Sequence, residues 1–136
     1  MSTYAELQVG SKGTFEKTIS ETDVYLFAGI SGDFNPAHVN EVKAQKSMFK
    51  GRIVHGYLTA SFISTVIGTR MPGEGTIYLS QSFRFLKPVR VGDTIRAEVT
   101  VIDKLEKGRL RLDTKCFNQD GEIVVDGEGL VIAPRE

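Results

Sequence analysis

Two residues of the types most used for proton transfer, Asp33 and His38, lie five positions apart in the first third of the chain. Pro36 lies between them and restricts the backbone, so the segment that carries both side chains is expected to be stiff. Such a pair suits general acid–base chemistry. An aspartate and a histidine at this spacing can equally be surface neighbours or share a loop-stabilising hydrogen bond, so the pair alone leaves both interpretations open.

A second candidate is Ile53-Val54-His55-Gly56, where apolar residues lead into a glycine at the expected start of a helix. A glycine there leaves its N–H uncovered at the positive end of the helix dipole, which suits an anion or a developing oxyanion. The alternative is that Gly56 only permits a tight turn or close packing. His55 could act as a base, although a histidine at a helix start is more commonly a structural hydrogen-bonding residue.

A strand and a helix are expected ahead of the acid–base pair. Alternating residues predict the strand at 13–19. Ser20, with Asp23 three positions later, predicts a capped helix start, and helical spacing continues to about Ile30. Gly32 stands where a left-handed residue would end that helix.

The segment that carries the pair, 33–38, is predicted to be a loop. Pro36 lacks an N–H, and it pushes Asn35 away from helical dihedral angles. Asn40 then predicts the cap of a short helix that runs to about Lys46.

The remainder predicts one buried helix followed by a sheet. Residues 56–68 are apolar or small on nearly every side, which is typical of a helix surrounded by protein. Alternation of period two then predicts antiparallel strands at 77–85, 95–101, 109–116 and 123–132, with Ile77, Leu79, Phe83 and Phe85 sharing one face. We therefore expect an α+β fold over residues 1–136, a single domain with a curved antiparallel sheet wrapped around a central helix.

The composition excludes several other classes of function. Seventeen basic residues balance seventeen acidic ones, so the net charge favours neither nucleic acid nor an anionic membrane as a partner. Cys116 is the only cysteine, and the first ten residues lack the pattern of a signal peptide, so a cytoplasmic location is expected. The sequence contains no zinc-type spacing, phosphate-binding loop or dinucleotide fingerprint. We therefore expect that the protein binds neither a metal nor a cofactor.

Two motifs together carry a family resemblance. DFNPAH at 33–38, followed by GRIVHGYLTASFIS at 51–64, resembles the MaoC-like (R)-specific enoyl-CoA hydratases, whose signature has the pattern Asp-x-Asn-Pro-x-His. The similarity extends over essentially the whole chain, through PGEG at 72–75 and KPVRVGD at 87–93. The resemblance implies a hot-dog fold that dimerises, an active site near the subunit interface, and a coenzyme A thioester as substrate.

The resemblance also implies roles for particular residues. Asp33 and His38 match the catalytic pair, and which of them is acid or base stays open. Gly56 matches the oxyanion-hole donor, and Asn35 matches a residue that orders the loop. Ser64 matches a serine of the acyl pocket, to which we add Ile67 as a further residue expected to contact substrate.

The expected activity is the reversible, (R)-specific syn hydration of a short trans-2-enoyl-CoA, such as crotonyl-CoA, to (R)-3-hydroxyacyl-CoA. Neither a metal nor a cofactor is required for it. Two enzyme alternatives are a 3-hydroxyacyl-acyl-carrier-protein dehydratase and a hot-dog acyl-CoA thioesterase, and a third alternative is a non-catalytic acyl-CoA binding protein. The expected partners are the acyl-CoA substrate and a second copy of the chain, in a homodimer or a larger homo-oligomer.

Overall fold

A five-stranded antiparallel sheet forms the larger layer of the protein in the computed structural model, which describes residues 2–135. The strand order is β1-β3-β4-β5-β2. The strands are β1 (Lys12–Thr18), β2 (Ile77–Phe85), β3 (Thr94–Lys104), β4 (Arg109–Phe117) and β5 (Ile123–Ile132), and a short 3-10 turn, η1 (Glu106–Gly108), joins β3 to β4. Burial alternates along most of β3, along β4 and along the second half of β5, as a sheet covered on one face requires.

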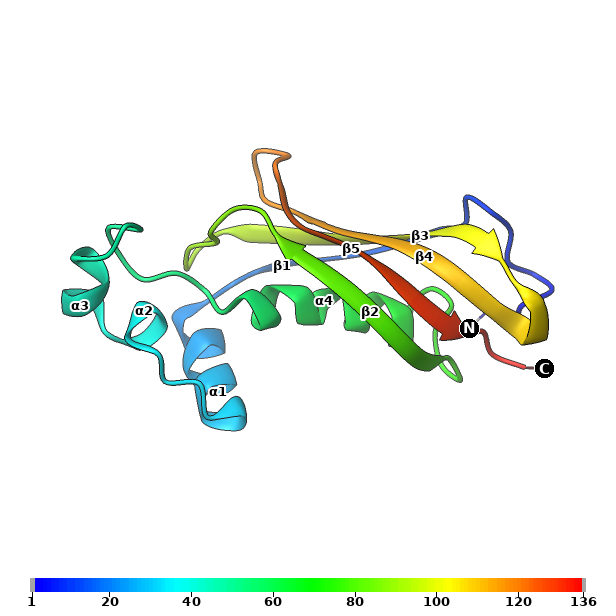
Figure 1. Cartoon of the computed structure of the whole chain (residues 1–136), viewed down its shortest axis with the longest axis horizontal. Helices are drawn as coiled ribbons and strands as arrows, with labels where there is room; N and C mark the ends of the chain where they lie inside the picture. The colour runs from blue at the N-terminus through cyan, green and yellow to red at the C-terminus, as the bar shows by residue number, and fades with distance from the viewer. Residues whose placement is uncertain (1, 136) are drawn as a thin grey trace.

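Helix α4 (Gly56–Thr69) runs along the covered face of this sheet (Figure 1). It packs against β1, β3, β4 and β5, and its buried side chains form the centre of the hydrophobic core: Leu58, Ala60, Phe62, Ile63, Val66 and Ile67. The expected α+β arrangement, with a sheet laid over a central helix, is confirmed. Within residues 2–135, none of the helices has the length and apolar character needed to cross a membrane.

The far face of α4 is open, which corrects the expectation of a helix surrounded on all sides. Tyr57 is 65% exposed, and Ser61 and Ser64 are exposed beside it. A single sheet can cover only one side of a helix, so the apolar and small residues on the other side are left uncovered by this chain.

Three helices project beyond one end of the sheet (Figure 1), and we call them the overhang: α1 (Glu21–Ser31), α2 (Pro36–Val39) and α3 (Glu41–Gln45). The predicted ends of α1 are confirmed. The Ser20 hydroxyl accepts the Asp23 N–H, the Asp23 carboxylate accepts the Ser20 N–H, and Gly32 ends the helix in the left-handed conformation at φ 81°. The Asn40 cap of α3 is confirmed as well.

The prediction of a loop throughout 33–38 was wrong, because Pro36 begins helix α2. Proline at the first helical position sacrifices no hydrogen bond, and its fixed φ suits the helix. Asn35 has φ −53° and ψ 129°, outside the helical region, as a residue before proline should, and its side chain accepts the Ala37 N–H as the helix cap. His38 therefore lies on a helical turn that is fixed at its start.

Strand β2 contains a bulge that changes which of its residues face the helix. Tyr78 pairs with Val131 and Ser80 with Leu130, so Leu79 is an extra residue in the ladder. A bulge shifts the alternation by one residue. Ile77 therefore lies on the opposite face from Phe83 and Phe85, and the prediction that these residues share a face was wrong.

Gly127 on β5 lets β2 approach closely, which places the end of β2 over the start of α4. A Cβ added at Gly127 would lie 1.8 Å from the Ser82 carbonyl oxygen.

We therefore expect Gly127→Ala to lower the free energy of unfolding by about 3 kcal/mol, because the backbone of β2 must shift. Gly29 in α1 has open space around it, so Gly29→Ala should raise stability by about 0.5–1 kcal/mol. Urea denaturation of both variants checks this, and equal stability of the two would contradict it.

Candidate active site

One cavity of about 730 Å³ lies where the overhang meets the start of α4 and the end of β2. Asp33, His38 and Gly56 all line it, so the three residues that the sequence singled out for catalysis are brought together. Reasoning from the sequence did not identify most of the apolar residues that line the same cavity, which include Phe27, Met48, Phe49, Phe85, Leu86 and Val89. These residues come from segments far apart in the chain.

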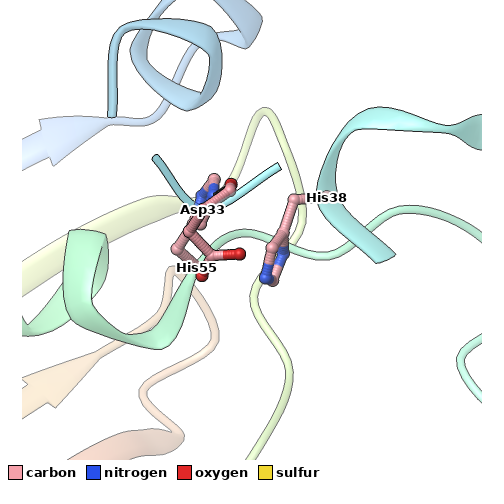
Figure 2. A group of neighbouring side chains, drawn as sticks. All are labelled: Asp33, His38 and His55. Atoms are coloured by element: carbon pink, nitrogen blue, oxygen red, sulfur yellow. Dashed lines mark hydrogen bonds between the residues drawn. The ribbon is translucent and has the colours of Figure 1, made fainter. Parts of the chain in front are cut away.

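Asp33 follows directly after the C-terminal glycine of α1. Its Oδ1 accepts the backbone N–H of Asn35 at 3.2 Å, and its own N–H donates to Ser31 Oγ at 3.2 Å. This short turn fixes the carboxylate while the side chain stays exposed to the cavity. Figure 2 shows the carboxylate directed toward the ring of His38.

His38 is half-buried, and its ring is held at one nitrogen. Its Nδ1 lies 2.8 Å from the carbonyl oxygen of Ile53. A carbonyl oxygen can only accept, so Nδ1 carries the hydrogen and the neutral ring presents an unprotonated Nε2. Because Nδ1 is occupied, Nε2 is the nitrogen that is left to exchange protons.

Residues 52–55 lead into α4, and we call them the entry segment; backbone hydrogen bonds hold this segment from two sides. The Ile53 N–H donates to the Ala37 carbonyl at 2.9 Å, and the Val54 N–H donates to the Val89 carbonyl at 2.7 Å. The first bond ties the segment to α2 and the second ties it to the loop after β2. Asn35 acts on the same region by capping α2, which agrees with its expected role in ordering this part of the chain.

His55 is buried, with 2% of its surface exposed, and it contacts both members of the pair. Its Nε2 lies 2.9 Å from the backbone carbonyl oxygen of Asp33, so this nitrogen carries the hydrogen. Its ring stacks on that of His38 with centroids 3.9 Å apart and planes inclined by 27° (Figure 2). The interpretation of His55 as a structural hydrogen-bonding residue is confirmed, whereas its contact with His38 was not foreseen.

The three side chains form a compact cluster. A carboxylate oxygen of Asp33 and a ring nitrogen from each histidine lie within 4.8 Å of one another. One water molecule that hydrogen-bonds to two such atoms can span up to about 5.6 Å, so the cluster fits a shared water. A metal ion would have to lie in the planes of both imidazoles, and nearly parallel stacked rings are poorly arranged for that.

Gly56 opens α4 and lies against an aromatic ring. A Cβ added at Gly56 would approach Phe85 ring atoms at 2.7 and 2.8 Å, so the missing side chain permits this contact. His55 is the N-cap of α4 but makes no side-chain capping bond, and the first N–H groups of a helix lack intrahelical partners. The amide of Gly56 is thus at the positive end of a helix that faces the cavity.

Arg52 ties the overhang to the same entry segment. Its guanidinium donates to the Glu21 carboxylate at 2.7 Å and to the Tyr25 hydroxyl at 3.0 Å. The hydrogen bond from Arg52, and after it the one that the Tyr25 hydroxyl donates to the same carboxylate at 2.9 Å, lower the pKa of Glu21 from its usual value. The Arg52 N–H also donates to Glu41 at 3.1 Å, so one residue links α1, α3 and the chain before α4.

Ser64 and Ile67 lie apart from the cluster. Ser64 lines a second cavity of about 490 Å³ along the open face of α4, whereas Ile67 is 1% exposed in the core and lines neither cavity. Phe27 and Tyr57 line both cavities, so the two adjoin. Burial raises the pKa of Tyr78, in the second cavity, to about 12, so its hydroxyl stays protonated at neutral pH. Contact of Ser64 and Ile67 with substrate stays a prediction.

Comparison with known proteins gives matches along almost the whole chain. The family model described as "MaoC like domain" matches residues 6–119. The (R)-specific enoyl-CoA hydratase of Rhodospirillum rubrum is 50% identical over 132 residues, covering 96% of this chain and 91% of that protein. The 3-hydroxybutyryl-CoA dehydratase of Methylorubrum extorquens is 44% identical over 134 residues, covering 98% and 85%.

A solved structure confirms the expected hot-dog fold. R-hydratase PhaJ1 from Pseudomonas aeruginosa, in its unliganded form, superposes with a TM-score of 0.94 at 48% identity, covering 98% of this chain and 86% of that one.

The two carbonyl acceptors predict opposite tautomers for the only two histidines. In the neutral rings, His38 should carry its hydrogen on Nδ1 and His55 on Nε2. Long-range ¹H–¹⁵N correlation spectra of protein labelled at histidine distinguish the two forms, and the spectrum of His38→Ala assigns the signals. The same tautomer at both rings would contradict the hydrogen bonding described here.

Proposed function

This chain belongs to the MaoC-like domain family, and from that membership we propose that it catalyses the reversible, (R)-specific hydration of short trans-2-enoyl-CoA thioesters. The names of the two relatives describe addition of water and its removal, and the four-carbon acyl group in the second name favours a short chain. The observation that carries the proposal is the meeting of Asp33, His38 and the Gly56 amide in one cavity.

Hydration of a double bond conjugated to a thioester makes three demands on the protein. The thioester oxygen must be stabilised as negative charge develops on it, a water must lose a proton as it attacks the β-carbon, and a proton must reach the α-carbon. The water's O–H bond and the carbon–carbon π bond break, and new C–O and C–H bonds form. No electrons are transferred to or from the substrate, so the reaction needs no redox partner.

Gly56 is assigned to the first demand. Its N–H, at the positive end of α4, donates to the thioester oxygen as the enolate-like charge forms. One such donor typically accounts for about a hundredfold to a thousandfold in rate. The absence of a side chain at residue 56 lets the Phe85 ring pack against the start of α4, beside this amide.

Asp33 and His38 are assigned to the other two demands. A carboxylate oxygen of Asp33 and a ring nitrogen of His38 lie within 4.8 Å of one another, a separation that one water can bridge. We assign the proton exchange to Nε2 because Nδ1 donates to the Ile53 carbonyl. One member of the pair accepts the proton from the water as it attacks, and a proton returns to the α-carbon from the same side of the substrate. Both additions therefore take place on one face of the double bond.

The thioester enters past a basic residue. Lys87 lines the cavity and pairs with the Glu122 carboxylate, whereas Arg52 and Arg90 do not line the cavity and donate to groups elsewhere in the protein. From the Gly56 amide, the acyl chain points past Tyr57 toward the second cavity, where Ser64 lies. The position of Ser64 in the second cavity supports the proposal that it lies in the acyl pocket.

The homodimer is proposed to form through the edge strand β2 and the open face of α4. Ile77 and Leu79 of β2 are 55% and 41% exposed, and an apolar edge strand favours pairing with another chain. Tyr57 on α4 lies next to this edge and lines both cavities. A second copy placed there covers the apolar surface and closes the acyl path.

The proposed activity is tested with crotonyl-CoA. The protein should remove the enoyl absorbance and yield (R)-3-hydroxybutyryl-CoA without release of free thiol. Asp33→Asn and His38→Ala should each lower kcat by at least about a hundredfold, because each removes an acid–base group. Asp120→Asn, in the exposed hairpin turn between β4 and β5, is the matched control and should retain the wild-type rate.

Three results would contradict this proposal. Release of free coenzyme A would indicate a thioesterase, and acyl-CoA binding without turnover would indicate a binding protein. Turnover of a carrier-protein-bound substrate far above that of crotonyl-CoA would move the assignment to the carrier-protein dehydratase.

The proposed interface is tested by a charge on β2. Leu79→Lys should convert the dimer to a monomer at micromolar concentration in sedimentation velocity, because a buried unpaired lysine is costly. Ile102→Lys places the same charge on another exposed strand residue and should leave the dimer intact. A monomeric wild-type protein, or a dimeric Leu79→Lys, would exclude this interface.

A further inference from the structure

His55 is the one member of the side-chain cluster to which the proposed reaction gives no task. We propose that His55 is a positioning residue, which aligns Asp33 through its backbone and His38 through its ring. This inference rests on the proposed function and deepens it, because it concerns how the pair is held for the reaction. Three observations carry it: a hydrogen bond, a ring stack and the place of His55 in the chain.

The hydrogen bond fixes the backbone of the catalytic aspartate. His55 Nε2 donates to the Asp33 carbonyl at 2.9 Å, across 22 positions of sequence. Asp33 is an exposed residue after the end of α1, and its other hydrogen bonds within residues 2–135 join it only to Ser31 and Asn35. The bond from His55 is therefore what attaches this turn to the start of α4, inside the main body of the protein.

The ring stack fixes the plane of the catalytic imidazole. His38 Nδ1 is held by the Ile53 carbonyl, but a single hydrogen bond leaves the ring free to rotate about its direction. The His55 ring, 3.9 Å away, blocks that rotation on one side. The Phe27 ring also packs against the His55 ring, with centroids 4.9 Å apart, so the His55 ring is itself held in place.

The place of His55 in the chain connects the pair to the third group of the site. His55 directly precedes Gly56, and the neighbouring Val54 is pinned to Val89. A change in the His55 backbone would move the Gly56 amide as well. His55 thus holds the Gly56 amide, Asp33 and His38 in fixed positions relative to one another.

Direct proton transfer by His55 does not fit its surroundings. The ring is 2% exposed, and Nε2 is occupied by the Asp33 carbonyl. Nδ1 is buried and has no hydrogen-bond partner among residues 2–135. A ring with one nitrogen engaged and the other enclosed is suited to hold its neighbours, which is why its effect should appear in alignment.

The test separates the hydrogen bond from the bulk of the ring. His55→Phe keeps an aromatic ring but loses the donor, whereas His55→Gln places an amide nitrogen at the same distance along the side chain as Nε2. With crotonyl-CoA, His55→Phe should lower kcat about a hundredfold, with KM changed by no more than about threefold, because misalignment weakens the transition state more than binding. His55→Gln should restore kcat to within about tenfold of wild type.

The experiment also includes a second variant that loses the hydrogen bond, His55→Asn, and a control for stability, Val66→Ala. His55→Asn carries the same amide on a side chain too short to reach Asp33, so it should resemble His55→Phe and replaces it if that variant fails to fold. Val66→Ala, in the core of the same helix and lining neither cavity, should lower the melting temperature while kcat stays near wild type.

The inference would be overturned if His55→Phe or His55→Asn kept kcat within about threefold of wild type. The role of the hydrogen bond to Asp33 would equally be overturned if the glutamine variant lost as much as they do, since restoring the donor would then restore no activity. Both results leave the hydratase proposal standing. That proposal fails only if the wild-type protein does not hydrate the substrate, or if Asp33→Asn and His38→Ala remain active.

Discussion

Two hydrogen bonds from imidazoles to backbone carbonyls hold the site together. His38 of the overhang donates to Ile53 of the entry segment, and His55 of the entry segment donates to Asp33 of the overhang. The connection is therefore reciprocal, and each bond also fixes a tautomer. The hydrogen bonds that join the overhang to the entry segment also decide which nitrogen of each ring is left without a hydrogen. A change that breaks one of these bonds would therefore affect both the fold and the proton transfer.

These bonds matter because the overhang has little core of its own. Only Val24, Ala28 and Ala44 are buried within its three helices, whereas α4 and the sheet share an extensive core. The overhang is accordingly held by polar contacts, with Arg52 bridging α1 and α3 in addition to the two histidine bonds. The rigid body supplies the Gly56 amide, and the tethered overhang supplies the acid–base pair.

The surface left open by one chain lies next to the site. The exposed face of α4 and the edge strand β2 border the second cavity, and Tyr57 lines both cavities. The bulge at Leu79 and the close approach at Gly127 determine how β2 lies over α4. The proposed dimer would therefore cover apolar surface and shape the acyl path with the same contacts.

The sequence by itself determined the caps of α1 and α3, the alternation of the later strands, the family, and the candidates Asp33, His38 and Gly56. These follow from short-range hydrogen bonds, from periodicity and from a motif of six residues. Tertiary structure alone decided the bulge in β2, the nitrogen that His38 presents, the Phe85 contact and the link from His55 to Asp33. Those features depend on contacts between residues at least 15 positions apart in the chain. Local sequence patterns cannot predict such contacts.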